Sequence, residues 1–208
     1  MRNKSLAVLV ILCLLLPVSV GARSLLNVSL GFGAAYSPDE ETEFSLGMED
    51  PNNWLFGGEI SARLAFLQAQ AMIFPIQCND EENSSGVLMI GMGSMSLPIL
   101  GSLLSLELGA GVGVTYVPTN STGSKSYYAL PQGAKADSED VTFGEAVWKS
   151  PVYLQAGFGT EVGPIGVKLR YLMESKQTVG SVLASHAWWG AFDLEKGTLS
   201  LALALKMF

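Results

Sequence analysis

The sequence predicts an all-β fold, an antiparallel transmembrane barrel with eight strands as the first interpretation and ten as the alternative. Three observations support this prediction. The 208 residues include 23 Gly but only 15% charged residues, apolar residues alternate with small or polar ones, and acidic residues gather between the alternating segments. An average soluble domain carries about 25% charged residues. The composition therefore argues against an ordinary cytosolic enzyme and favours a secreted, membrane or β-rich protein.

The first 22 residues have the pattern of a secretory signal peptide. Arg2 and Lys4 precede an apolar run over Leu6–Leu16, and Val20-Gly21-Ala22 fits a cleavage site with small residues. We therefore expect a signal peptide over 1–22 and one domain over 23–208. Cleavage would leave Cys78 as the single cysteine, which excludes an internal disulfide.

Apolar residues recur with a period of two along most of the remaining chain. In Leu103–Val117, for example, Leu and Val positions alternate with Ser, Glu and Gly. The same pattern occurs in Leu26–Tyr36 and in Ile165–Glu174. A period of two predicts strands rather than helices.

The less apolar face of these strands combines glycines with a few charges. This face predicts the interior of a narrow barrel whose outside meets lipid. Eight strands leave room inside for side chains or one small ligand, and buried charges must pair. We therefore expect a network of three bases and two acids that plugs a wide aqueous path: Glu59, Arg63, Glu107, Lys168 and Arg170.

Five aromatic residues share the apolar face and lie near expected strand ends. In an outer-membrane barrel such rings form a girdle at the bilayer interface. The predicted girdle consists of Tyr36, Trp54, Tyr116, Trp148 and Tyr171. The alternative is that these are ordinary aromatic residues at strand ends.

The expected strands alternate with long and short connections, as in bacterial outer-membrane barrels. The predicted strands are 26–36, 53–64, 66–76, 86–97, 103–117, 147–161, 164–174 and 197–208. The long loops would face outward and cover 37–52, 77–85, 118–146 and 175–196. The short turns would lie near 65, 98–102 and 162–163.

Three stretches leave alternatives open. Residues 182–194 resemble a further strand, but an odd count is unfavourable, so we expect an ordered outer loop or an extension of the last hairpin. A ten-stranded barrel would require another strand pair within 118–146. The uncharged run Gly86–Leu106 is long enough for a membrane helix, but its Gly residues and Pro98 favour strand, turn and strand.

Several of these segments together resemble the small outer-membrane β-barrel proteins, in particular the OmpW-like group. The resemblance covers about residues 87–174. It is carried by Ser96-Leu97-Pro98, Leu108–Val114, Leu154–Gly159 and Val167–Tyr171. Phe208 resembles the terminal aromatic that barrel assembly machinery recognises, although it is out of phase with the preceding leucines. The resemblance implies a narrow passage for small, including hydrophobic, solutes.

The acidic residues favour a different role for the loops. Of the 19 acidic residues, 13 fall in three loops: Asp39, Glu40, Glu41, Glu43, Glu49, Asp50, Asp80, Glu81, Glu82, Asp137, Glu139, Asp140 and Glu145. They lack the ordered ligand spacing of a calcium loop, so we expect a solvated surface and no metal site. The net charge of −7 and the absence of a basic tract argue against nucleic-acid binding.

The sequence thus favours a protein of the bacterial outer membrane without cofactor or catalytic residues. The first functional hypothesis is a narrow porin-like channel, and the alternative is a structural or adhesin-like protein that presents acidic loops. Its expected partners are outer-membrane lipids, the barrel assembly machinery, and a host or other surface ligand at the loops. A lipid-modifying enzyme using His186 with Ser185 and Asp193 is a distant third, because neighbours in one loop need not converge into a triad.

Overall fold

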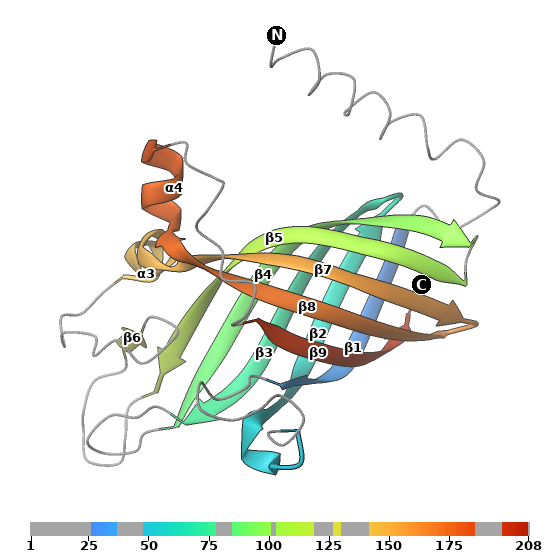
Figure 1. Cartoon of the computed structure of the whole chain (residues 1–208), viewed down its shortest axis with the longest axis horizontal. Helices are drawn as coiled ribbons and strands as arrows, with labels where there is room; N and C mark the ends of the chain where they lie inside the picture. The colour runs from blue at the N-terminus through green and yellow to red at the C-terminus, as the bar shows by residue number, and fades with distance from the viewer. Residues whose placement is uncertain are drawn as a thin grey trace, which may run out of the picture.

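The computed structural model describes residues 26–36, 48–77, 85–100, 103–118, 127–129, 142–185 and 197–207. Eight antiparallel strands in this part of the chain close into a barrel (Figure 1). They are β1 (Leu26–Tyr36), β2 (Trp54–Leu64), β3 (Leu67–Gln77), β4 (Ser85–Leu100), β5 (Leu104–Val117), β7 (Pro151–Val162), β8 (Ile165–Thr178) and β9 (Thr198–Lys206). The predicted fold class is confirmed.

The ring follows the chain order and closes between its first and last strands. Each strand pairs with its neighbour, and β1 pairs with β9 from Ser29↔Lys206 to Tyr36↔Leu199. The three-residue strand β6 (Tyr127–Ala129) pairs only with the end of β5 and takes no part in the ring. The eight-stranded ring is therefore complete, and the ten-stranded alternative is wrong.

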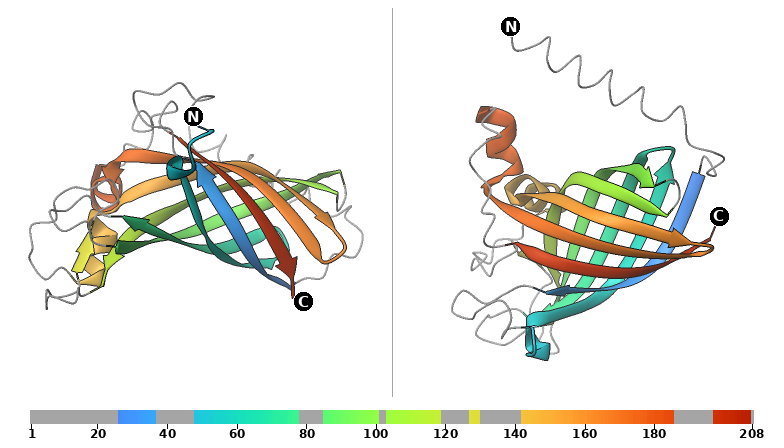
Figure 2. Two further views of the ribbon diagram at one scale, coloured as in Figure 1. Left: turned by 90° about the horizontal axis from the view of Figure 1, so that it is seen from below. Right: turned by 45° about the vertical axis from the view of Figure 1, so that its right-hand side comes forward.

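The two ends of the barrel differ, as Figures 1 and 2 show. The turns at one end are short, and two of them place a residue in the left-handed region, Ala65 at φ 56° and Gly163 at φ 62°. The strand ends that the long connections join, the 3-10 helix η2 (Pro51–Asn53) and two α-helices lie at the other end. This is the alternation of short turns and long loops that the sequence predicts.

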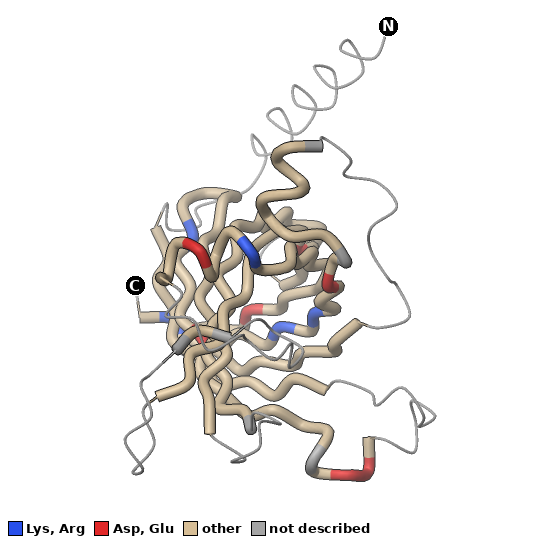
Figure 3. The backbone as a smooth tube through the Cα atoms, turned by 90° about the vertical axis from the view of Figure 1, so that its left-hand side faces the viewer, with Lys and Arg blue, Asp and Glu red and all other residues tan. Residues whose placement is uncertain are grey.

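The polarity of the barrel is inverted relative to a soluble protein. Large apolar side chains face outward and are about half exposed, including Leu30, Phe32, Ile60, Phe158 and Leu203. The alternate positions face inward and include nearly all the buried charged residues. Charged positions are accordingly sparse along the barrel wall (Figure 3). A continuous apolar exterior of this kind is typical of a barrel surrounded by lipid.

One predicted strand begins later than expected. Residues 147–149, assigned to a strand by sequence, belong instead to helix α3 (Phe143–Lys149). Thr142 caps this helix: Glu145 N donates to Thr142 Oγ1 at 3.3 Å, and Thr142 N donates back to the Glu145 carboxylate at 3.0 Å. This capping box starts the helix, and Pro151 cannot continue it. The strand therefore begins at Pro151.

The cap makes helix α3 sensitive to pH. The hydrogen bond from the Thr142 backbone, together with that from its hydroxyl, holds the pKa of the Glu145 carboxyl below its ordinary value. This contribution to helix stability is therefore present above the ordinary pKa and is lost as the pH falls through the lowered one. We expect the amide chemical shifts of 143–149, measured in micelles, to lose helical character on acidification.

The variant Thr142→Ala should show that loss already at neutral pH. Helix α4 (Val179–Ser185), which has no acidic residue in its first turn, serves as the internal control. Equal acid sensitivity in both helices would contradict the cap as the cause.

The segment after β8 also differs from the sequence-based expectation. Strand β8 continues to Thr178, beyond the predicted end at residue 174, and helix α4 follows. Residues 182–185, which resemble a further strand in sequence, are thus helical. The run Gly86–Leu106 forms β4 and the start of β5, so two strands are present as predicted. The predicted turn at 98–102 is wrong in its bounds, because β4 continues through Pro98 to Leu100 with a register shift between these two residues.

Several sequence-based predictions lie outside the described residues. These are the signal peptide, Cys78, His186, Phe208 and most of the acidic loop residues. No helix among the described residues is long and apolar enough to cross a membrane.

Candidate functional site in the barrel lumen

Four of the five predicted lumen charges meet inside the barrel. Glu59 comes from β2, Glu107 from β5, and Lys168 and Arg170 from β8. Each occupies an inward position because it alternates with outward apolar residues on its own strand. Since β2, β5 and β8 are separated by other strands in the ring, their side chains meet across the lumen.

Arg170 is the centre of this lumen charge network, which we define as Glu59, Glu107, Lys168 and Arg170. Its Nη1 and Nη2 donate to the two carboxylate oxygens of Glu59 at 2.6 and 2.8 Å, and its Nε donates to Glu107 Oε2 at 3.2 Å. Lys168 Nζ donates to Glu59 Oε1 at 2.8 Å and to Ser61 Oγ at 3.1 Å. The two-pronged contact between a guanidinium and a carboxylate is both strong and geometrically specific.

The network is shielded from water. The exposed fraction of the side chain is 0% for Arg170, 2% for Glu107 and 4% for Glu59. An open aqueous pore would leave its lining accessible to water. The section of the barrel at Arg170 is therefore filled by its own side chains.

Two glycines of β7 make space for the network. A Cβ at Gly157 would contact the Leu169 carbonyl oxygen and lie 2.9 Å from Cα and Cγ of Arg170. A Cβ at Gly159 would lie 3.1 Å from Glu107 Oε1. The glycines on the inner face thus allow large charged side chains to fit in a narrow barrel.

Arg63, the fifth predicted charge, pairs separately. Its Nη1 donates to Glu161 Oε1 at 2.7 Å, near the end of the barrel with short turns. Glu161 is a third acid beside the two predicted ones, so the three bases are matched by three acids; sequence reasoning missed it. Glu161 alternates in phase with the inward residues Gln155, Gly157 and Gly159 of the same strand, and this phase could have identified it as inward.

The pair of Arg63 with Glu161 should contribute less to stability than the lumen charge network, because the Glu161 side chain is 26% exposed. We expect Arg63→Gln to lower the free energy of unfolding by about 1 kcal/mol. Urea unfolding in detergent would measure this, with Lys149→Gln on the exposed helix as control. If Arg63→Gln lowered the free energy of unfolding as much as a substitution of Arg170 does, the pair would not be the weaker contributor and the prediction would be wrong.

The half of the lumen nearer the long loops is mostly apolar. On β3 the inward residues change from Gln68 and Gln70 to Met72 and Phe74, and on β4 from Ser94 to Met92 and Ile90. The buried members of this apolar layer are Ala35, Met72, Phe74, Ile90, Met92, Tyr153 and Leu172. The sequence predicts a small and polar interior, which is correct only for the other half.

Polar side chains next to the network carry unmet hydrogen-bonding groups. Among the described residues, neither the nitrogen nor the oxygen of the Gln70 and Gln155 side-chain amides has a hydrogen-bond partner. The amide nitrogen of Gln68 also has none. Buried amides are almost always hydrogen-bonded to protein or ordered water. Ordered water would satisfy these amides in the polar half of the lumen.

The five aromatic residues of the predicted girdle have different environments. Tyr36 is fully buried, with its ring 5.3 Å from that of Trp54. The ring of Tyr116 lies 5.4 Å from that of Tyr128, and the Tyr171 hydroxyl accepts a hydrogen bond from Gly197 N. Trp148 lies on helix α3 rather than at a strand end, because the capping box extends the helix through this residue.

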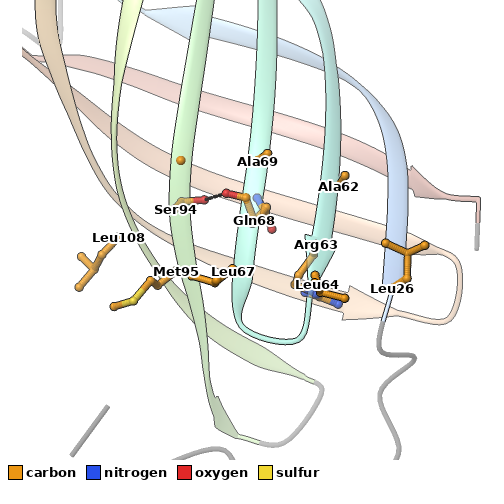
Figure 4. Close-up of a pocket in the computed structure, with 11 residues that line it drawn as sticks. Leu26, Ala62, Arg63, Leu64, Leu67, Gln68, Ala69, Ser94, Met95 and Leu108 are labelled. Atoms are coloured by element: carbon orange, nitrogen blue, oxygen red, sulfur yellow. Dashed lines mark hydrogen bonds between the residues drawn. The ribbon is translucent and has the colours of Figure 1, made fainter. Parts of the chain in front are cut away.

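Among the described residues, the outer wall has an apolar groove of about 480 Å³ near the end with short turns (Figure 4). Ala62, Ala69 and Gly93 are paired neighbours on β2, β3 and β4. Larger residues line it as well, including Leu64, Leu67 and Met95. Because the pairing of these strands is unbroken here, the groove is a depression in the wall and gives no passage into the lumen.

No family model matches the sequence, and no curated protein matches it. Solved structures do resemble the fold. OprH of Pseudomonas aeruginosa, an outer-membrane protein, is 15% identical with a TM-score of 0.50, over 87% of this chain and 99% of that one. The N-terminal barrel domain of OprF from the same organism is 12% identical with a TM-score of 0.48, over 87% and 97%. Neisserial surface protein A is 12% identical with a TM-score of 0.45, over 88% and 98%.

The fold and the comparisons define the class of this protein. It is a closed, eight-stranded antiparallel barrel with an apolar exterior, the architecture of small bacterial outer-membrane barrels. The likeness to OprH supports this general fold and does not single out the OmpW-like group.

Proposed function

We propose that this protein is a closed barrel of the bacterial outer membrane that serves as a scaffold for its long loops. The proposal rests on one observation, the burial of Arg170, Glu59 and Glu107 where their side chains meet across the lumen. The apolar layer closes the lumen a second time, on the side of the long loops. In the described part of the barrel, these two successive layers of packed side chains argue against an open aqueous path.

The loops are then the part of the molecule that acts on its surroundings. The sequence places 13 of the 19 acidic residues in three of them. Such loops suit a partner with a basic surface, because opposite charges favour encounter. Outer-membrane lipids surround the barrel in this proposal.

Solute uptake tests this proposal. Protein refolded into phosphatidylcholine vesicles should cause no swelling in the smallest neutral sugars. Its heat-dependent gel migration would show that the barrel has folded. A variant with Asp39, Glu40, Glu41 and Glu43 changed to the corresponding amides should fold equally well, since a scaffold does not depend on the loops that it presents. Sugar uptake by the folded wild-type protein would contradict the proposal.

A second candidate is the narrow channel for small solutes that resemblance to the OmpW-like group implies. The observation that favours it is the set of buried glutamine amides that have no hydrogen-bond partner among the described residues. Removing the charges in Glu59→Ala with Arg170→Ala separates the two candidates. If the charges alone restrict the passage, this variant would conduct. The scaffold would remain closed, because its apolar layer persists.

A further inference from the structure

Helices α3 and α4 form a pair at the long-loop end of the barrel, beside the end of β5 (Figures 1 and 2). In these views α4 projects sideways from the barrel instead of continuing along the strands. We propose that this helix pair rests on the outer leaflet of the membrane and inserts apolar side chains between its lipids. This inference rests on the proposed function, since it requires the barrel to span a membrane.

The helix pair exposes three large apolar side chains. The exposed fractions are 55% for Phe143, 56% for Trp148 and 53% for Leu183. Together with Tyr116 and Tyr128 we call these residues the helix-pair patch. Large apolar groups gathered on one feature indicate an interaction surface rather than ordinary scattered exposure.

The patch continues the lipid-facing wall, which identifies its partner. Tyr116 lies in the outward row of β5, in phase with Leu108 and Val112, although the intervening Val114 is buried. The Tyr116 ring lies 5.4 Å from Tyr128, and the Tyr128 ring lies 5.7 Å from Phe143 in an edge-on arrangement. Aromatic contacts thus connect the outer wall to α3. Because the wall below faces lipid, the same medium extends to the patch.

The chemistry of the pair suits the membrane interface rather than its hydrocarbon centre. Helix α3 carries Glu145 and Lys149 beside its apolar residues. A short helix with both charged and aromatic side chains lies in the headgroup region, where Trp and Lys are each accommodated. Lys149 would there meet anionic headgroups.

The two helices contact each other directly. Val179 N, at the start of α4, donates to the Ser150 carbonyl just after α3, at 2.9 Å. A Cβ at Gly180 would contact the Trp148 indole nitrogen, so this ring packs directly on the α4 backbone. The position of Trp148 is therefore fixed relative to both helices.

Fluorescence quenching tests the inference. In a variant with Trp54, Trp188 and Trp189 changed to Phe, Trp148 is the only tryptophan. In phosphatidylcholine vesicles, lipids with brominated acyl chains should quench Trp148, most strongly when the bromine lies near the glycerol. Quenching by aqueous iodide without quenching by brominated lipid would overturn the inference.

Spin labels give a second measurement and separate this inference from the proposed function. In a Cys78→Ser background, a label at Leu183→Cys should collide more with oxygen than with a water-soluble nickel chelate. A label at Glu145→Cys should show the reverse. Phe158→Cys on the barrel wall is the reference. If the label at Phe158→Cys collides mainly with oxygen and the label at Leu183→Cys mainly with the nickel chelate, only the helix-pair inference fails. Preferential collision of the label at Phe158→Cys with the nickel chelate would contradict the membrane-spanning barrel itself.

Discussion

Replacing Arg170 with Met is expected to lower the free energy of unfolding by about 3–5 kcal/mol, the usual loss when a buried ion pair loses one partner. Arg170 is the only residue bonded to both Glu59 and Glu107 in the network, and its side chain is fully buried. Its removal leaves Glu107 without that charged partner and Glu59 with Lys168 alone. Urea unfolding of the refolded protein in detergent, followed by gel migration and circular dichroism, would measure the loss.

A matched variant separates unpaired charge from lost packing. Neutralising the whole lumen charge network, by Glu59→Gln, Glu107→Gln, Lys168→Met and Arg170→Met, leaves no buried charge without a partner. The variant with all four substitutions should have a larger free energy of unfolding than Arg170→Met alone, since replacing a complete buried network is often tolerated. An additive loss over the four changes would contradict the explanation by unpaired charge.

The second large effect is expected at Gly157. A side chain here would contact the Leu169 carbonyl and clash with Arg170, which is paired with Gly157 on the adjacent strand β8. Because backbone cannot move aside as a flexible side chain can, Gly157→Val should lower the free energy of unfolding by about 3 kcal/mol, the upper range for overpacking. The same measurement of unfolding in urea applies.

Gly91→Val is the matched control for this prediction. Gly91 lies in a neighbouring part of the same barrel, but no atom lies within 4 Å of a Cβ built there. It is exposed on the outer face, so valine should fit and extend the apolar surface. Equal destabilisation by the two substitutions would show that glycine is needed for the strands in general rather than for space around Arg170.

The strands and their inward faces could be predicted because the two faces differ strongly in polarity. In β5, Gly and Glu alternate with Leu and Val, so the parity alone identifies Glu107 as inward. The same reasoning places Glu59, Arg63, Lys168 and Arg170. The partners could not be predicted, because contact across the lumen depends on how β2, β5 and β8 are staggered around the ring.

Other features were missed because their local pattern is ambiguous. In the second half of β3, Met72 and Phe74 alternate with Ile73 and Pro75, so both faces are apolar and the apolar layer of the lumen has no distinct signal. Helix α3 is too short for periodicity to reveal. Its capping box, Thr142 with Glu145, is present in the sequence. Interpreting Trp148 as a girdle residue at a strand end instead favoured a strand from residue 147.

The most direct test of the closed lumen is ion conductance. Wild-type protein, refolded and inserted in a planar phosphatidylcholine bilayer, should show no stepwise current in concentrated potassium chloride, since Arg170 and the apolar layer fill the lumen in succession. Insertion would be verified by protease protection of the barrel in vesicles of the same lipid. Steady stepwise conductance from correctly folded, inserted wild-type protein would contradict the account.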